Sequence, residues 1–472
     1  MNRYCFIIFL LIIVTGQPLA SQQVITLEEA RKMALEVNPT ANIAMKNVEK
    51  ADAERKTALS FYLPTISGTA TMAYFENGIK EDLFLPVYKP DVSSGQLVPD
   101  FFYHPITGLP IYDESGNPIF KSYAYLPLEI SLKGAYMAGI QIQQPIYTGG
   151  KIAAANRMAK IGQQLAEENL LLQKLQLIYE VDQAYWLLLS VEGKVKLAAT
   201  AVSMLDSLRE KVSNAVKVGL VHHSDLLKVN VEYNQALYDL QKAKSGREMA
   251  RMALCQMVGL PLNTNLILAD SIIQIEQNIL HQFDNESIEQ RPEHRILSGL
   301  VALEEQNIRL EQSKYLPNFG IAAGYSKIGN IDLGPKTLGS QGFNAMATLN
   351  IPLFHWGEGR NKIKSAKLSK EIKQLEKENA TQLMQLELEQ TKKDLQDAWV
   401  KIQYTQTALD EASKNLELSK QRYQLGQEHV TDLLLSQTQW QKASTNLIEA
   451  KIEFKIRETA YMKASGKLQF PQ

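Results

Sequence analysis

Two short stretches decide the fold of this chain: residues 217–227, KVGLVHHSDLL, and residues 424–434, QLGQEHVTDLL. In each, a glycine is followed six residues later by Asp-Leu-Leu, and a long helical pattern lies on both sides. A glycine just past a helix end can take the left-handed backbone that caps the helix, and an aspartate ahead of an apolar run can cap the next helix. Each stretch is therefore predicted to be the tip of a long antiparallel helical hairpin, with Asp225 and Asp432 as the N-caps of the returning helices.

The sequence around the tips is also part of an internal repeat. An offset of 207 positions (426 − 219) relates the two tip glycines and continues without a gap for more than a hundred residues. Earlier landmarks pair at an offset of 253 (315 − 62), because the first copy carries 46 extra residues (253 − 207) between Pro64 and Pro145. The sequence therefore predicts two copies of one unit, at 21–270 and 271–472. The segment 75–133 of the first copy, rich in Pro, Gly and aromatic residues, is predicted to be a long loop.

Each tip is flanked by long helical patterns of unequal length. Residues 151–216 and 358–423 contain no proline and are rich in Leu, Ala, Gln, Glu and Lys, so each is predicted to be one helix on the order of 100 Å long. The returning helices, 225–258 and 432–465, are about half that length. Shorter helices at 28–62 and 287–314 are predicted to lie end to end with them. Apolar positions such as Val229, Tyr233 and Ala236 recur at steps of four and three, which is typical of a coiled-coil seam.

Four segments ahead of the long helices alternate with a period of two: 65–75, 134–146, 319–327 and 343–351. One face of each is apolar and the other is small or polar, and each has roughly the length of a transmembrane β-strand. The alternative is a pair of half-buried hairpins in a soluble sheet. Four strands cannot close a barrel, and an open edge in lipid leaves backbone groups unsatisfied. If these strands span a membrane, several chains must share one barrel.

The N-terminus and the composition limit the class of protein. Arg3, an apolar run at 6–14 and Pro-Leu-Ala at 18–20 are typical of a secretory signal peptide, here 1–20. The run is shorter than the about 20 residues that a membrane helix needs, and Cys5 precedes it, so an exported protein without a lipid anchor is expected. Only Cys255 then remains, which excludes an internal disulfide. The balance of 50 Lys+Arg against 51 Asp+Glu gives no support to nucleic-acid binding.

No catalytic constellation is present in the sequence. It has no phosphate loop, nucleophile elbow or paired Cys or His at metal spacing, so neither an enzyme nor a cofactor is expected. Histidines and acids do gather in the tip sequences, which raises the hypothesis of a metal site or a pH-dependent gate. Solvated tip residues are the favoured interpretation. The histidines concerned are His222, His223 and His429.

The order and duplication of these motifs resemble the TolC-like outer membrane efflux proteins, also called outer membrane factors. The motifs are Tyr-Leu-Pro before a strand, Pro-Leu-Phe-x-x-Gly at 352–357 entering a helix, and Tyr-x-x-Gly-x5-Asp-Leu-Leu at 423–434. The resemblance implies a homotrimer with a twelve-stranded outer-membrane barrel and a periplasmic α-helical tunnel. It also implies a passive exit duct in tripartite efflux, such as multidrug export, or in type I secretion. The partners would be a periplasmic adaptor (membrane fusion) protein and an inner-membrane pump of the RND or ABC type.

The resemblance also implies roles for the tip residues. Asp432 and Tyr423, with Asp225 of the first tip, would form the periplasmic gate. Leu435 stands where relatives often carry a second acid, and Glu428 where some carry a basic residue. An exported coiled-coil adaptor or scaffold without a pore is the alternative function, and the substrate and pump class are left open. The adaptor-docking residues would be Gly219, Leu220, Val221, Gly426, Gln427 and Glu428.

Overall fold

The computed structural model describes residues 23–77, 79–130, 134–270, 287–332 and 337–471. The predicted signal peptide, 1–20, lies outside them. The chain divides into a helical unit, Met1–Lys56, Ala155–Ile308 and Lys362–Gln472, and a strand unit, Thr57–Ala154 and Arg309–Asn361. These units differ from the two copies predicted as domains. Each copy supplies strands to one unit and helices to the other, so each compact unit gathers one type of element from both copies.

The helices of the two copies correspond closely. The long helices contain 67 residues each and agree with the prediction to within one residue, because no proline interrupts their hydrogen bonds. In the first copy the helices are α1 Leu27–Val37, α2 Pro39–Ser60, α3 Lys151–Lys217 and α4 His223–Met257. In the second they are η2 Ile288–Gln290, α5 Pro292–Ser313, α6 Glu358–Gln424 and α7 Val430–Ala464. No described helix is long and apolar enough to cross a membrane.

The first helical pattern begins and breaks where its residues dictate. The Thr26 hydroxyl accepts the Glu29 N–H at 3.2 Å, and the Glu29 carboxylate accepts the Thr26 N–H at 2.8 Å, which completes a capping box. Asn38 then leaves the helical region with ψ 129°, because the ring of Pro39 disfavours helical backbone in the residue before it. One helical pattern thus becomes α1 and α2.

In both copies the returning helix ends where the short helix begins. The Asn38 side-chain amide donates to the Met257 carbonyl at 3.3 Å, so the end of α4 meets the start of α2. At the matching place in the second copy, the Arg291 guanidinium donates to the Ala464 carbonyl at 3.4 Å, between α7 and α5. Helices of 22 and 35 residues therefore follow one another beside a helix of 67 residues. The predicted end-to-end arrangement is confirmed.

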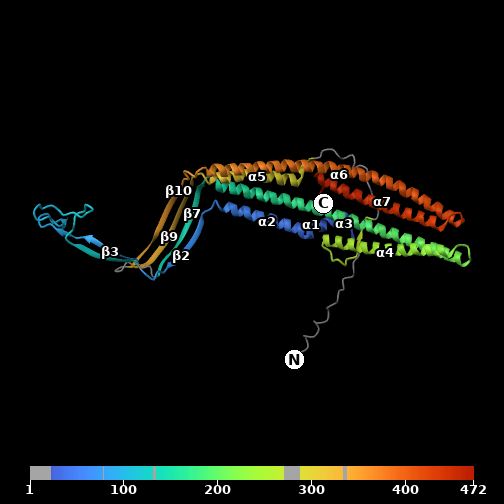
Figure 1. Ribbon diagram of the computed structural model, residues 1–472, viewed down its shortest axis with the longest axis horizontal. Helices are drawn as coiled ribbons and strands as arrows, with labels where there is room; N and C mark the ends of the chain where they lie inside the picture. The colour runs from blue at the N-terminus through green and yellow to red at the C-terminus, as the bar shows by residue number, and fades with distance from the viewer. Residues whose placement is uncertain (1–22, 78, 131–133, 271–286, 333–336, 472) are drawn as a thin grey trace, which may run out of the picture. The chain divides into compact units, whose positions relative to one another are not determined.

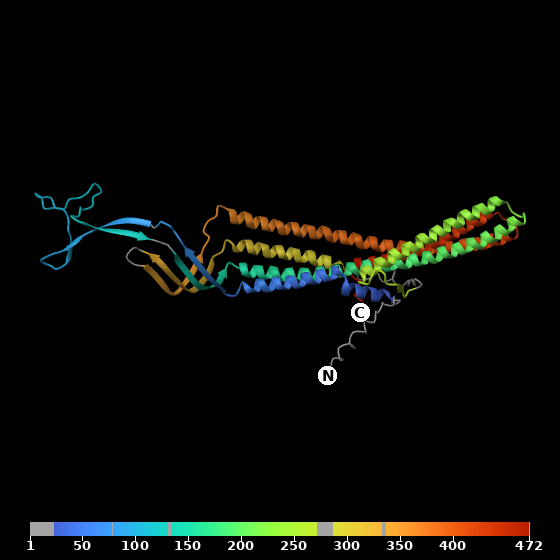
Figure 2. The same ribbon diagram turned by 90° about the horizontal axis from the view of Figure 1, so that it is seen from below.

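The helical unit packs as neighbouring hairpins. In both views α4 runs back along α3, and α7 along α6 (Figures 1 and 2). The helix α5 lies between the long helices, with ion pairs from Arg295 to Glu168 of α3 at 3.0 Å and from Lys370 of α6 to Glu305 at 3.3 Å. Many seam positions of α4, α6 and α7 are buried, as their spacing predicts. They include Val229, Ala236, Ala250, Leu254, Ala398, Ile402, Leu416, Leu447, Ala450, Phe454 and Tyr461.

A pair of short strands packs against the helices of the first copy. The strand β1, Gln23–Ile25, pairs in parallel with β8, Leu266–Leu268. Both pack into an apolar cluster with Tyr185 of α3 and Leu254 of α4. The segment that follows α4 thus contains a short strand, and 271–286 lie outside the described residues.

The strand unit contains a four-stranded antiparallel sheet in the order β10-β9-β7-β2. Residues that pair across neighbouring strands point to the same face. The register aligns Ile66 with Ile142 and Ile140 with Tyr325, and Tyr325 with Phe343, so one apolar face runs across all four strands. The predicted alternation of apolar and polar residues is confirmed, and the strands pair in a register that brings their apolar residues to one face. The strands are β2 Thr65–Ala73, β7 Ala135–Thr148, β9 Asn318–Asp332 and β10 Thr337–Asn350.

The segment 75–133 is not the long loop that its composition predicts. It contains β3 Ile79–Pro86 paired with β6 Tyr123–Ile130, and β4 Tyr88–Pro90 paired with β5 Leu97–Pro99. Rings of Phe84 and Tyr125 lie 5.5 Å apart across the first pair. The Pro and Gly signals mark the turns between these strands, whereas the pairing joins residues too far apart for a local pattern to show.

Candidate functional site

The candidate site consists of the two hairpin tips, where each long helix ends on a glycine. Gly219 has φ +75° and Gly426 φ +71°. The N–H of Leu220 donates to the Ala215 carbonyl and that of Gln427 to the Arg422 carbonyl, both at 2.9 Å, and each tip glycine donates to the residue after that acceptor. This is the Schellman cap, in which the left-handed residue reverses the chain without a steric penalty. The predicted caps are confirmed at both tips.

The predicted N-caps of the returning helices are wrong. The N-cap residues are His222 for α4 and His429 for α7, and neither makes a side-chain capping bond. Asp225 and Asp432 lie in the first turns instead. A carboxylate there stabilises the helix through its dipole and need not accept a capping hydrogen bond. Asp225 accepts a bond from Lys228 at 3.1 Å.

The two tips of one chain pack on each other. A single apolar cluster joins all four tip helices, and Tyr423 and Trp440 lie half-buried against it. Burying these side chains is favourable by roughly 25 cal/mol for each Å² of apolar surface, so the tips form one structural element. The cluster consists of Leu205, Leu208, Val212, Val229, Ala236, Leu416, Val430, Leu433 and Leu434.

Two of the three predicted gate residues come together across the tips. Burial raises the pKa of Tyr423 above its usual value, and the negative charge of Asp225 raises it further. Both effects favour the neutral phenol, which can donate to a carboxylate. Asp432 does not join them: although it belongs to the same tip as Tyr423, it is exposed and does not line the cavity that Tyr423 and Asp225 share. The structure therefore pairs Tyr423 with the first tip and not with its sequence neighbour.

Most of the predicted docking residues line the same cavity as the gate pair. The cavity has a volume of about 960 Å³ and lies between the tips. Gly219, Gln427 and Asp432 are not on its wall. Both sets of predicted residues thus contribute to one hollow of mixed apolar and charged character. The predicted residues that line it are Leu220, Val221, Asp225, Tyr423, Gly426 and Glu428.

Glu428 has a specific partner within its own hairpin. The Ser419 hydroxyl of α6 donates to the Glu428 carboxylate. Nearby, the Asn415 amide donates to the Ser436 hydroxyl at 3.1 Å and joins α6 to α7. Glu428, which stands where some relatives carry a basic residue, is therefore hydrogen-bonded within the second hairpin.

The tip histidines are exposed side chains in a single chain. His222, His223 and His429 lie at the surface, and within the described residues no three His, Cys, Asp or Glu side chains gather as a metal site requires. A metal site or pH-dependent gate built from the tips of several chains stays a hypothesis.

A buried ion pair in the middle of the helical unit was not predicted from the sequence. Asp182 is 0% exposed. It accepts two bonds from Arg31, at 2.7 and 2.5 Å, and one from the Thr459 hydroxyl at 2.8 Å. Burial has the largest single effect and lowers the pKa of Arg31, but the bond to Asp182 and the negative charges around Arg31 together outweigh it, so the pKa is raised. The available signal was a pair of acids, Glu180 and Asp182, inside the largely apolar stretch 177–189.

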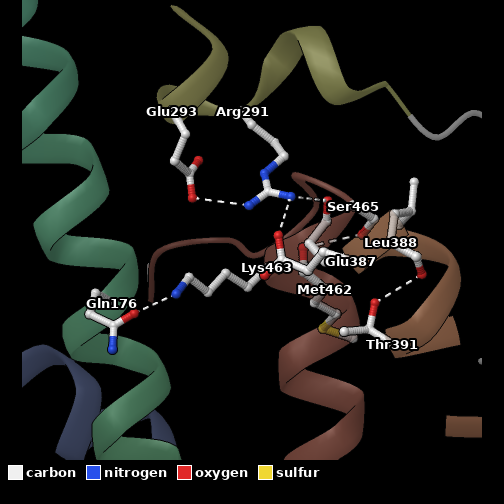
Figure 3. Close-up of polar contacts among 10 residues, drawn as sticks. Gln176, Arg291, Glu293, Glu387, Leu388, Thr391, Met462, Lys463 and Ser465 are labelled. Carbon is white, nitrogen blue, oxygen red and sulfur yellow. Dashed lines mark hydrogen bonds and ion pairs between the residues drawn. The ribbon is translucent and has the colours of Figure 1, made fainter. Parts of the chain in front are cut away.

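A second missed group holds the α7–α5 junction (Figure 3). Arg291 is 3% exposed and donates to Glu387 of α6 at 2.8 Å and to Glu293 at 3.1 Å. Lys463 of α7 donates to Gln176 of α3 nearby. Arg291 takes the place that Asn38 has in the first copy, so the neutral junction of one copy is charged in the other. The offset of 253 that aligns Asn38-Pro39 with Arg291-Pro292 was the signal.

Solved structures resemble this chain over 93% of its length. CmeC, the outer membrane channel of Campylobacter jejuni, is 18% identical, with a TM-score of 0.68 and 85% of that chain covered. The outer membrane protein VceC of Vibrio cholerae is 15% identical, with a TM-score of 0.69 and 96% covered. The MtrE outer membrane channel of Neisseria gonorrhoeae is 18% identical, with a TM-score of 0.67 and 88% covered. At these identities the likeness shows the fold.

Sequence comparison gives the family. Protein CyaE of Bordetella pertussis is 22% identical over 275 residues, which cover 57% of this chain and 58% of that protein. The chain therefore matches little more than half the length of this curated relative. The model of the outer membrane efflux protein family matches residues 129–260 and 286–467, which include both tips, both long helices and three strands of the sheet. The chain belongs to the outer membrane efflux protein family.

Proposed function

We propose that three copies of this chain form a passive exit duct through the outer membrane. The cargo is handed over by an inner-membrane pump and a periplasmic adaptor, in tripartite efflux or type I secretion. The observation that carries the proposal is the four-stranded sheet with one continuous apolar face. An apolar face of this kind suits contact with lipid.

The edges of the sheet support the proposed trimer. Among the described residues β10 and β2 are the outer strands and pair on one side only. In lipid an unpaired edge costs several kcal/mol for each unsatisfied backbone group. Copies that join β2 of one chain to β10 of the next remove every edge. Three copies give twelve strands, the number that the resemblance implied.

The helical unit supports a periplasmic tunnel with its gate at the tips. Tyr423 of one hairpin and Asp225 of the other line the same cavity, and Asp432 supplies an exposed charge near the same end. Exposed apolar side chains such as Leu220 and Leu425 suit docking of the adaptor. The chain carries no nucleotide-binding motif, so energy would come from the pump. Export through a cleaved signal peptide, without a lipid anchor, completes the proposal.

Planar-bilayer recording of the purified trimer tests the duct. Stepwise conductance is expected, and Asp432→Ala is expected to raise it because a ring of charges is removed from the mouth. The alternative, a coiled-coil scaffold without a pore, predicts stable oligomers that never conduct. That result would overturn the duct.

Docking at the tips has a separate test. Replacing Gly219 or Gly426 with Trp changes the cap, where φ is positive, and leaves both the sheet and the core between the helices intact. We expect export from cells to be lost while crosslinking still recovers trimers. Normal export by both variants would refute docking at the tips.

A further inference from the structure

Between the ends of its strands, the second face of the sheet carries no charge; Asp332, which ends β9 and pairs with Thr337, lies beyond these positions. Across the paired positions 65–73, 135–145, 318–328 and 340–350, the only charged side chain is Lys327. Lys327 pairs with Ala138 and Gln341, so it lies on the apolar face. The opposite face has hydroxyls, amides, methionines and small residues. Its members include Thr65, Ser67, Thr69, Thr71, Met137, Gln141, Gln143, Ala322, Ser326, Asn344, Met346 and Thr348.

This neutral face is also hollow at its centre. A cavity of about 310 Å³ lies over it, with Met137, Gln141 and Asn344 on its wall. Two glycines form its floor because the strands leave no room there for a side chain. A Cβ at Gly139 would lie 2.8 Å from the Tyr325 carbonyl, and one at Gly324 would lie 2.7 Å from the Ile140 carbonyl. The lack of side chains at these positions keeps the face open.

We propose that this face is the wall of the transport path through the membrane, and that it does not sort cargo by charge. The proposal rests on the proposed function, since the face lines a path only if the sheet is part of a duct. Neutral hydroxyl and amide groups both donate and accept hydrogen bonds, so they serve anionic, cationic and zwitterionic groups alike. Rings of charged side chains are what make a pore selective by charge.

The consequence is a division between the two units. Charge selection would arise in the helical unit, where Asp225, Glu428 and Asp432 lie at the tips. The strand unit would let through any solute that has passed the tips, and only the size of the solute would limit its passage. The class of cargo is therefore set by the tips and their partners and not by the sheet.

Cysteine labelling tests the wall, because the chain provides a clean background. Cys255 is 0% exposed, and Cys5 lies in the predicted signal peptide. Asn344→Cys places a thiol on the neutral face, and Phe343→Cys places one on the apolar face one residue earlier, where the native ring is 89% exposed in the single chain. Full-length trimers in lipid vesicles would be treated with a cationic and an anionic methanethiosulfonate of similar size.

We expect the thiol at 344 to react with both reagents. The ratio of the two rates, divided by the ratio for a free thiol in the same buffer, should lie within about threefold of one, because no neighbouring charge attracts either reagent. The thiol at 343 should stay unlabelled in lipid. Adding Gln141→Glu, on the same face, should shift the normalised ratio several-fold toward the cationic reagent.

Three results would overturn the proposal. A normalised ratio of tenfold or more at 344 would show that charge acts on the wall. Labelling at 343 but not at 344 would show that the apolar face, and not the neutral face, is in contact with water. A ratio that Gln141→Glu does not change would show that residues 141 and 344 do not face the same aqueous space. Single-channel current from the same vesicles separates these failures from failure of the duct, because a trimer that conducts but labels wrongly refutes only the wall.

Discussion

Replacing Gly259 by alanine would test the end-to-end junction of the first copy. Gly259 ends α4 with φ +74°, and a Cβ there would lie 2.4 Å from Cγ1 of Val37. Gly466 is its counterpart in the second copy, with φ +71° but no atom nearer than 3.8 Å. The left-handed backbone costs a non-glycine residue about 1–2 kcal/mol at either position. The overlap with Val37 adds about 1–3 kcal/mol of overpacking at Gly259 alone.

The assay is thermal unfolding of the detergent-solubilised protein, followed by circular dichroism at one scan rate and one protein concentration. Gly259→Ala should lower the midpoint clearly more than Gly466→Ala does. The double variant Gly259→Ala with Val37→Ala should recover the difference, because Val37 is half exposed and its truncation costs little by itself. Equal losses for the two single variants, or no recovery in the double variant, would refute the reasoning from the contact.

Three further predictions concern polar contacts. Asp182→Asn should lower the free energy of unfolding by about 3–5 kcal/mol, because it leaves the Arg31 charge without a counter-charge. The exposed Glu49→Gln is the control, and an unfolding midpoint no lower than that of this control would contradict the prediction. Tyr423→Phe should raise single-channel conductance by removing the hydroxyl beside Asp225, and a closed-state current identical to wild type would count against the gate. Arg291→Asn installs the residue of the first copy, so it should keep the bond to the Ala464 carbonyl and lose the bonds to Glu387 and Glu293. The expected loss is about 1.5–3 kcal/mol in the free energy of unfolding; thermal unfolding measures it, and an unchanged midpoint would show that these two ion pairs contribute nothing.

Local signals were sufficient to predict the long helices, the hairpin tips and the four strands of the large sheet. The long helices follow from the absence of proline at 151–216 and 358–423, and the hairpin tips follow from Gly219 and Gly426. The strands follow from alternation, which the pairing of Ile140 with Tyr325 then extends across the sheet. Each of these features depends on residues within a few positions of one another, so local sequence is enough to predict it.

Contacts between distant residues could not be predicted in this way. Asp182 meets Arg31 and Thr459, which belong to different helices and to different copies, and nothing in the spacing of these residues indicates it. Tyr423 and Asp225 are brought together by the packing of one tip on the other. The paired strands within 75–133 likewise depend on partners at opposite ends of the segment.

The N-caps failed for a local reason instead. An aspartate ahead of Leu-Leu fits a cap, but the helices start earlier, at His223 and Val430. The histidines before them take extended backbone, and the aspartates then fall in the first turn. A one-turn error of this size is common at helix ends, where several residues can serve as the first.

The pairing of β1 with β8 also bears on how the chain folds. β1 is the first described element to be synthesised, yet its partner follows the whole first hairpin. Ile25 is buried in the cluster that Leu266 and Leu268 complete, and the Tyr185 hydroxyl donates to Asp270 just beyond them at 2.6 Å. Parallel pairing across so long a loop is slow, because the loop must close before the contacts form. The strand that is synthesised first is thus among the last to be paired, and until then its backbone groups have no partner strand.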